Sequence, residues 1–214
     1  MQAIFHIEKW RFEIRNYCHE RDLDYGKEKL LMLQLKFFGI GGQGVVTGAK
    51  ILSKAVSLYE DEYAVTIPSY GHERRGAPVN TSMIVDKEPV LLNSFVYEPD
   101  VVIVFDPTLP QKNVNVANGI HKDSVLILNS EDPEVVKQYK DMGFTKIFYV
   151  DATAIAYKYI GRAIPNSSML GAIAKAGVCS IESVEKAIAE TFGKKAGDKN
   201  AESARETYNK TAEM

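Results

Sequence analysis

One glycine-rich stretch constrains the fold more than any other part of this chain. The strand-like run Leu33–Phe38 leads into Gly39-Ile40-Gly41-Gly42-Gln43-Gly44, after which small and apolar residues recur at helical spacing. This order is typical of a buried parallel strand, a tight turn and the N-terminus of a helix. The N–H groups that open such a helix, here those of Val45 and Val46, have no partner inside it and favour an anion.

Strand-like and helix-like segments alternate along the rest of the chain. We predict further strands at 63–67, 79–85, 101–105, 124–129 and 146–150, and helices at 46–60, 133–142, 152–159, 167–176 and 181–192. The polar tail 198–214 has helical propensity. This alternation predicts an α/β fold with a mostly parallel sheet and helices on both faces, a Rossmann-like three-layer arrangement.

The first 31 residues do not share this pattern. They are highly charged, and their bulky apolar residues fall at irregular spacing. A chain of 214 residues suits one sizeable α/β domain with an appendage. We therefore expect a single domain over 32–214, preceded by an N-terminal extension at 1–31 to which the sequence assigns no role.

Composition excludes several classes of partner and site. A net charge of -2 gives no electrostatic case for nucleic acid. No apolar run is long enough to span a bilayer and none resembles a signal peptide, so we expect no membrane contact and a cytoplasmic location. Two cysteines, Cys18 and Cys179, cannot hold a four-thiolate iron–sulfur cluster and form no CxxC pair.

The glycine turn can be interpreted in several ways. Gly39-x-Gly41-x-x-Gly44 matches the dinucleotide fingerprint, but the second strand ends in Ile67-Pro68-Ser69 without the ribose-binding acid that NAD requires. A P-loop is excluded because Val45-Val46 stands where Lys and Ser/Thr must follow the last glycine. The missing acid counts against NAD without excluding it. Three interpretations stay open: a turn shaped only for helix–sheet packing, a dinucleotide site, and a site for another anionic ligand or a partner group.

A charged loop at 69–78 is the second candidate. Glu73, Arg74 and Arg75 lie between glycines and prolines that fix its shape. If the strands are parallel, the loop and the glycine turn share one edge of the sheet, where two arginines could bind a phosphate or carboxylate. The alternative is a solvated turn. Asp106 ends the most apolar strand at the same edge and could equally begin a turn, and Asn166-Ser167-Ser168 is typical of helix capping.

These motifs resemble the gamma subunit of the 2-oxoacid:ferredoxin oxidoreductases. The stretch 39–50 resembles the opening of that subunit, and the loop 69–79 resembles its second signature in the form associated with the pyruvate enzyme. Relatives acting on other 2-oxoacids more often have Arg-Gly-Gly where this chain has Arg75-Gly76-Ala77. Pro165–Ala172, Phe192–Lys195 and Asn200 also fit, so that the resemblance covers 32–214.

The resemblance implies a function shared among several chains. Such enzymes decarboxylate a 2-oxoacid oxidatively, form an acyl-CoA and reduce ferredoxin. Thiamine diphosphate, Mg and 4Fe-4S clusters would sit in the alpha, beta and delta partner subunits. This chain lacks the thiamine diphosphate motif and would hold no cofactor alone, while supporting assembly and contacting CoA.

Carried over residue by residue, the resemblance implies that the turn faces CoA or a partner. The residues concerned are Gly39, Gly41, Gly42, Gln43 and Gly44 in the turn, with Glu73, Arg74 and Arg75 beside them. No catalytic residue and no metal ligand is implied. Two alternatives stay open: a gamma subunit for 2-ketoisovalerate, 2-oxoglutarate or indolepyruvate, and a stand-alone NAD- or FAD-binding oxidoreductase.

Overall fold

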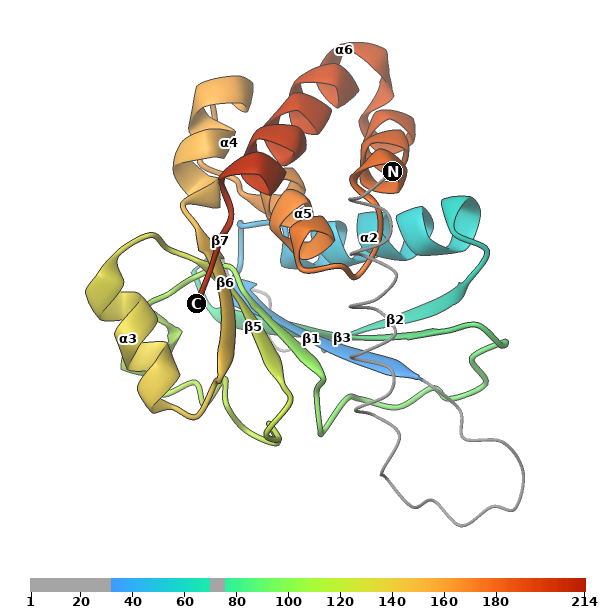
Figure 1. Cartoon of the computed structure of the whole chain (residues 1–214). Helices are drawn as coiled ribbons and strands as arrows, with labels where there is room; N and C mark the ends of the chain where they lie inside the picture. The colour runs from blue at the N-terminus through green and yellow to red at the C-terminus, as the bar shows by residue number, and fades with distance from the viewer. Residues whose placement is uncertain (1–31, 70–75) are drawn as a thin grey trace.

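A computed structural model describes residues 32–69 and 76–214 of the chain (Figure 1). The extension predicted at 1–31 lies outside the described residues, and so do Glu73, Arg74 and Arg75. No helix within the described ranges is long and apolar enough to cross a membrane.

A seven-stranded sheet forms the middle layer, in the order β2-β3-β1-β4-β5-β6-β7. The strands are β1 (Leu33–Ile40), β2 (Tyr63–Ser69), β3 (Pro78–Asp86), β4 (Val101–Val104), β5 (Val125–Asn129), β6 (Lys146–Val150) and β7 (Ala212–Glu213). The four central strands β1, β4, β5 and β6 are parallel, while β3 and β7 pair antiparallel with their neighbours. The predicted α/β fold with a mostly parallel sheet is confirmed.

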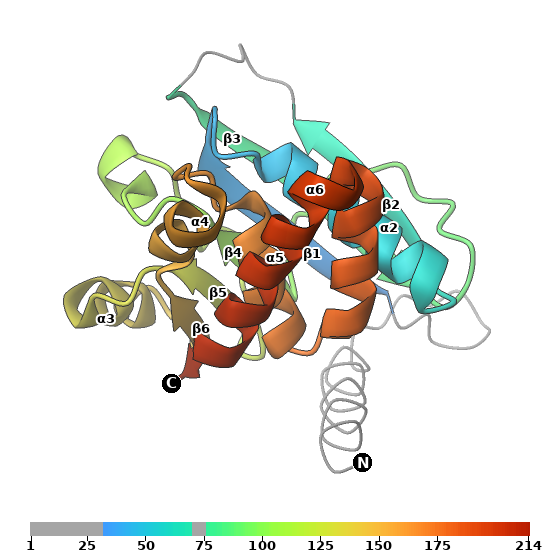
Figure 2. The same ribbon diagram turned by 90° about the horizontal axis from the view of Figure 1, so that it is seen from above.

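Helices cover both faces of this sheet (Figures 1 and 2). One face carries α2 (Val45–Tyr59), α4 (Ala152–Ile160), α5 (Asn166–Lys175) and α6 (Ile181–Lys210), whose apolar side chains form the larger core. The other face carries α3 (Pro133–Asp141) and the short 3₁₀ helix η2 (Leu109–Lys112), which enclose a second core. Every helix and strand predicted between 33 and 176 is present, with ends shifted by at most two residues.

The residue pattern explains why β4 lies at the centre. Val101 and Ile103 point into the larger core, whereas Val102 and Val104 point into the second core, and all four are fully buried. A strand that is buried on both faces reads as a continuous apolar run rather than an alternating one. The prediction of a central parallel strand here is therefore confirmed.

The second strand is not the neighbour of the first. β2 pairs antiparallel with β3, and β3 pairs antiparallel with β1. Only residues 70–77 join β2 to β3, too few for the crossover that a parallel pair requires, so the two strands form a hairpin. Two reversals leave β2 parallel to β1, and the ends Ser69 and Ile40 therefore reach the same edge of the sheet.

The helix after Ser180 extends beyond its predicted end at residue 192. Helical structure continues to Lys210, interrupted only at Gly193, where φ is 71° and ψ is 172°. The chain folds back there, and Gly197 packs so closely on Ala189 that a Cβ on the glycine would lie 2.8 Å from the alanine Cα. Ser180 caps the first half as predicted, because its hydroxyl accepts a hydrogen bond from the Ser183 N–H at 3.2 Å.

Candidate functional site

The candidate site lies at the carboxyl edge of the sheet, between β1 and β4. From β1 the chain passes through the glycine turn into α2 on one face, and from β4 it passes into η2 on the opposite face. Neighbouring parallel strands whose connections leave to opposite faces open a crevice at their carboxyl ends, where α/β folds bind ligands. The glycine turn and Asp106 therefore lie at the point where this topology places a ligand.

Two of the predicted site glycines are fixed by close packing. A Cβ on Gly39 would lie 2.5 Å from Val45 Cγ2 and 2.8 Å from Gln43 Oε1. Gly44 has φ 75°, in the left-handed region, and a Cβ there would lie 2.9 Å from the Cβ of Asn166. Both positions require glycine because the turn folds tightly on itself and on the start of α5.

Gln43 ties the turn to the end of β4. Its Oε1 accepts a hydrogen bond from the Ile40 N–H at 3.0 Å, while its Nε2 lies 3.4 Å from Asp106 Oδ2 and 3.5 Å from the Phe105 carbonyl oxygen. Asp106 Oδ1 in turn accepts hydrogen bonds from the Thr108 N–H at 2.8 Å and the Thr108 hydroxyl at 2.5 Å. Asp106 thus begins a turn, the plainer of its two predicted roles.

The C-terminal end of the charged loop reaches the glycine turn. Gly41 N–H donates to the Ala77 carbonyl at 2.8 Å, and Gly76 N–H donates to the Gly41 carbonyl at 3.0 Å. Together with the strand register, which brings Ser69 to the same edge as Ile40, these bonds show that both described ends of the loop lie at the edge that carries the turn. Gly42 is exposed at the tip of the turn, with φ 105°.

Two buried amides at this edge were not singled out as site residues. Asn129, at the end of β5, donates from Nδ2 to the Phe105 carbonyl at 2.7 Å and to Thr153 Oγ1 at 2.8 Å. The sequence signal was a polar residue ending an otherwise apolar strand. Asn166 packs against Gly44 and accepts the Ser167 N–H at 2.8 Å, whereas Pro165 is the N-cap of α5 and makes no side-chain capping bond. The capping role predicted for 166–168 is therefore wrong, because α5 already begins at Asn166.

A buried tyrosine packs beside this edge, on the face of the sheet that α3 and η2 cover. The Tyr139 hydroxyl on α3 donates to the Pro107 carbonyl oxygen at 3.2 Å. Burial, and then the nearby charge of Asp106, raise the pKa of Tyr139 well above its ordinary value. The phenol therefore stays protonated and holds α3 against the chain that follows β4.

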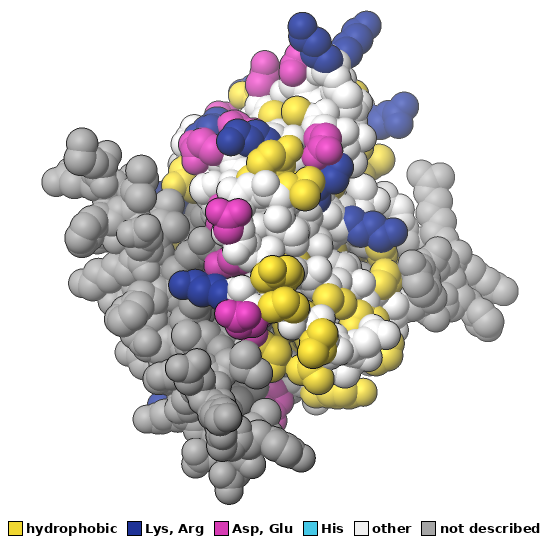
Figure 3. All heavy atoms as spheres, turned by 90° about the vertical axis from the view of Figure 1, so that its right-hand side faces the viewer, with side chains coloured by type: hydrophobic (Ala, Val, Ile, Leu, Met, Phe, Trp, Pro, Cys, Tyr) yellow, Lys and Arg dark blue, Asp and Glu magenta, His cyan; other side chains and the backbone are white. Residues whose placement is uncertain are grey.

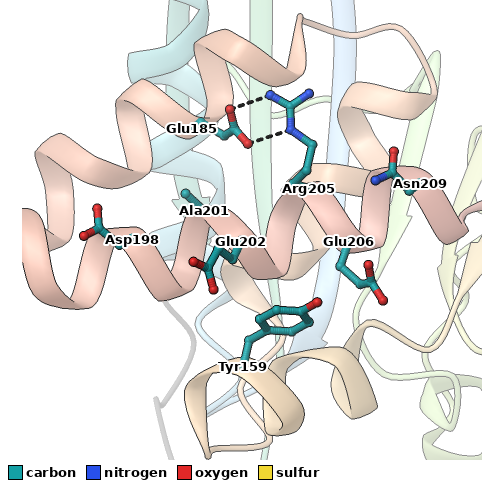
Figure 4. Close-up of a pocket in the computed structure, with 8 residues that line it drawn as sticks. All are labelled: Tyr159, Glu185, Asp198, Ala201, Glu202, Arg205, Glu206 and Asn209. Carbon is teal, nitrogen blue, oxygen red and sulfur yellow. Dashed lines mark hydrogen bonds and ion pairs between the residues drawn. The ribbon is translucent and has the colours of Figure 1, made fainter.

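A separate groove lies between α4 and the two halves of α6 (Figure 4). It measures about 530 Å³, and charged side chains line most of it. Arg205 donates to Glu185 from Nε at 2.7 Å and from Nη2 at 2.6 Å, and Glu206 pairs with Lys158 and Lys210. Hydrogen bonds to Glu185 are the main cause that raises the pKa of Arg205. These ion pairs link α4 and the two halves of α6, so we interpret the groove as a packing boundary between helices and not as a ligand site.

The polar groups that remain available for a ligand at the carboxyl edge suit an anion. The side chains of Gln43, Asp106 and Asn129 already bond to neighbouring residues, which leaves backbone N–H groups at the start of α2 and the exposed Gly42, Thr47 and Lys50. A helix N-terminus of this length attracts a phosphate or a carboxylate. In the part of the chain that is described, no group of three His, Cys, Asp or Glu residues could hold a metal ion.

Comparison with known proteins decides the family. Residues 34–210 match the protein family described as pyruvate ferredoxin/flavodoxin oxidoreductase. The chain belongs to this family. It is 44% identical over 183 residues to the pyruvate/ketoisovalerate oxidoreductases common subunit gamma of Pyrococcus abyssi, a match that covers 84% of this chain and 97% of the relative.

Two further relatives agree with this assignment. Pyruvate synthase subunit PorC of Methanocaldococcus jannaschii is 44% identical over 179 residues, which cover 83% of this chain and 96% of the relative. The crystal structure of pyruvate oxidoreductase subunit PORC from Thermotoga maritima superposes with a TM-score of 0.73 at 33% identity, covering 87% of this chain and 99% of that one. The resemblance to a gamma-type subunit is confirmed, and the interpretation as a stand-alone nucleotide-binding oxidoreductase is set aside.

Proposed function

We propose that this chain is the gamma subunit of a multi-subunit pyruvate:ferredoxin oxidoreductase, which decarboxylates pyruvate oxidatively to acetyl-CoA and reduces ferredoxin. The observation that carries the proposal is a match along almost the whole length of gamma and PorC subunits. Thiamine diphosphate, Mg and 4Fe-4S clusters supply the decarboxylation and electron transfer, and they belong to the alpha, beta and delta subunits. This chain supports assembly and contacts CoA.

CoA fits the carboxyl edge because its phosphates need an exposed anion site. Gly42 is uncovered, and the N-terminus of the 15-residue helix α2 begins beside it. Gly39, Gln43 and Gly44 hold this turn in shape, and Gly41 ties it to the loop of Glu73, Arg74 and Arg75. In the proposal the two arginines supply the charge that pairs with a CoA phosphate, and Glu73 orients one of them.

Purification of the complex through a tag on this chain tests the function. We expect the other subunits to co-purify and to reduce ferredoxin in the presence of pyruvate and CoA, with higher kcat/KM for pyruvate than for 2-oxoglutarate or indolepyruvate. A second candidate follows from the Pyrococcus abyssi relative, whose name describes a subunit common to two enzymes. If this chain is shared in the same way, a second set of catalytic subunits active on 2-ketoisovalerate will co-purify.

The CoA contact has its own test. Replacing Arg74 and Arg75 together by alanine is expected to raise the KM for CoA about tenfold or more while kcat and the KM for pyruvate change little, since charge-assisted bonds to a phosphate are lost. Lys137→Ala is the control, because Lys137 is an exposed cation on α3 over the other face of the sheet. An unchanged KM for CoA in the double variant would show that the loop is only a solvated turn.

A further inference from the structure

Exposed apolar side chains gather at the edge of the sheet opposite to the glycine turn. β3 ends at Asp86 and β4 begins at Val101, and the irregular segment between them contains Leu91, Leu92 and Phe95, which are 92%, 49% and 44% exposed. Figure 3 faces the side on which this segment lies in Figure 1 and shows hydrophobic side chains grouped there. We refer to Leu91, Leu92 and Phe95 as the amino-edge patch.

The segment that carries this patch is fixed at both ends. Asp86 Oδ1 accepts the Lys87 N–H at 2.6 Å, and Ser82 Oγ accepts the N–H of the buried Val96 at 3.0 Å. Beyond Val96, the carbonyl oxygen of Pro99 accepts the Ser124 hydroxyl at 2.7 Å. The chain is thus held against β3 and the start of β5 while the patch faces outward. Large apolar side chains grouped in an exposed patch, rather than scattered singly, mark an interaction surface.

Acidic side chains border the patch. Glu88 precedes it in sequence, and Asp61 lies just before β2, whose first residue Tyr63 is the register partner of Asp86. Both acids are exposed, against one exposed lysine, Lys87. Two copies of this chain meeting through the patch would bring like charges together. The complementary surface is apolar in its middle and bordered by lysine or arginine.

We propose that the amino-edge patch docks onto another subunit of the oxidoreductase through an apolar surface with a basic border. This inference rests on the proposed function, which requires partner subunits, and it assigns them a place on this chain. Because β1 runs the full width of the sheet, about 25 Å for eight residues, the docking surface and the CoA edge are separate. A partner can bind the patch without covering the glycine turn.

Variants of the chain within the reconstituted complex test the proposal. Leu91→Glu combined with Leu92→Glu is expected to weaken binding to the other subunits about tenfold or more, since exposed anchors at the centre of an interface dominate affinity. The melting temperature of the free chain should change little, because Leu91 is almost fully exposed and Leu92 is half-exposed. Glu88→Lys should weaken binding most at low salt. Tyr157→Glu is the control, since Tyr157 is 66% exposed on α4.

Hydrogen–deuterium exchange gives a second readout that needs no variant. The amides of 89–96 should exchange more slowly in the wild-type complex than in the free chain. Full-strength assembly of the Leu91/Leu92 variant without such protection would overturn the proposal. Two other results would also overturn it. If the variant loses self-association but still binds the subunits, a second copy of this chain covers the patch. If amides 89–96 are already protected in the free chain and lose that protection when 1–31 is deleted, those residues cover it. A wild-type chain that binds no subunit would instead overturn the proposed function itself.

Discussion

At the scale of single residues, the glycine turn contains two kinds of glycine. Gly39 and Gly44 are required because any side chain would collide with Val45 or Asn166, whereas Gly42 is exposed at the tip. Packing therefore explains Gly39 and Gly44, whereas the proposed ligand role applies to the exposed Gly42. A variant at a packed glycine should lose stability first, and a variant at the tip should lose ligand binding first.

Gly44→Ala tests the packed kind. Gly161 is a matched control, because its φ of 76° equals that of Gly44 within a degree but no atom lies within 4 Å of its Cβ position. Gly161→Ala should lower the free energy of unfolding by about 1–2 kcal/mol, from backbone strain alone. Gly44→Ala should cost about 2–4 kcal/mol, because contact with Asn166 adds to the strain. Calorimetric melting of the two variants measures the difference, and equal losses would contradict the packing role.

Lys36 gives a prediction about pH. It lies half-buried on β1, opposite Ser82 and Val102 on the neighbouring strands, and burial lowers the pKa of its ammonium group. A lysine whose pKa is lower in the folded state destabilises the fold while it is charged, and that cost disappears as the pH rises through its folded pKa towards the unfolded value. Lys36→Met should therefore raise the free energy of unfolding at pH 7, but only slightly, because solvent reaches much of the ammonium group and the Phe38 ring, 5.6 Å from Nζ, favours its charged form.

The gain from Lys36→Met should shrink as the pH approaches the ordinary lysine pKa. Denaturant unfolding at a series of pH values measures it, with Lys50→Met on the exposed side of α2 as the control. A gain of equal size at every pH would show that packing, and not the charge, causes the effect.

At the scale of helices and strands, periodicity predicted the elements but not their neighbours. The run Val101–Val104 is apolar on both faces, which is local information, and the sequence alone placed it correctly at the centre of the sheet. The hairpin of β2 and β3 could not be predicted in this way, because strand pairing depends on contacts between residues that are distant in the sequence. The two-residue strand β7 is too short to leave a pattern, and its place beside β6 follows from where α6 ends.

The candidate site divides in the same way. Its glycine turn and the position of its charged loop could be predicted, because both are fixed by local chain order and by the shared edge of parallel strands. The packing of Asn166 against Gly44 could not, since these residues lie on different helices and meet only when α5 crosses α2. Asn129 could be predicted only in part: the sequence shows a polar residue at the end of an apolar strand, but not that it bonds to the Phe105 carbonyl.

The fold-back in α6 depends on one glycine. The φ and ψ of Gly193 fall in a region that is open essentially to glycine alone, although nothing lies within 4 Å of its Cβ position. Gly193→Ala should cost about 1–3 kcal/mol and loosen the second half of α6, which the Arg205–Glu185 pair holds against the first. Circular dichroism melting measures the loss, with Lys194→Ala as the control. An unchanged melting temperature in Gly193→Ala would show that the bend adjusts without strain.

At the scale of the whole molecule, the proposals of ligand binding and of subunit docking fall on opposite edges of one sheet. The carboxyl edge joins the glycine turn, the described ends of the charged loop and the two buried amides Asn129 and Asn166, and the N-terminus of α2 begins there. The opposite edge presents the amino-edge patch. If both proposals hold, the CoA site and the docking surface are far enough apart for each to be changed by substitution without the other.

The most direct test of this account is the rate of pyruvate- and CoA-dependent ferredoxin reduction by the remaining subunits, measured with and without this chain. The account predicts that the rate falls to background when the chain is omitted, returns when it is added back, and is absent from the chain alone. An undiminished rate without this chain, at the same KM for CoA, would contradict it.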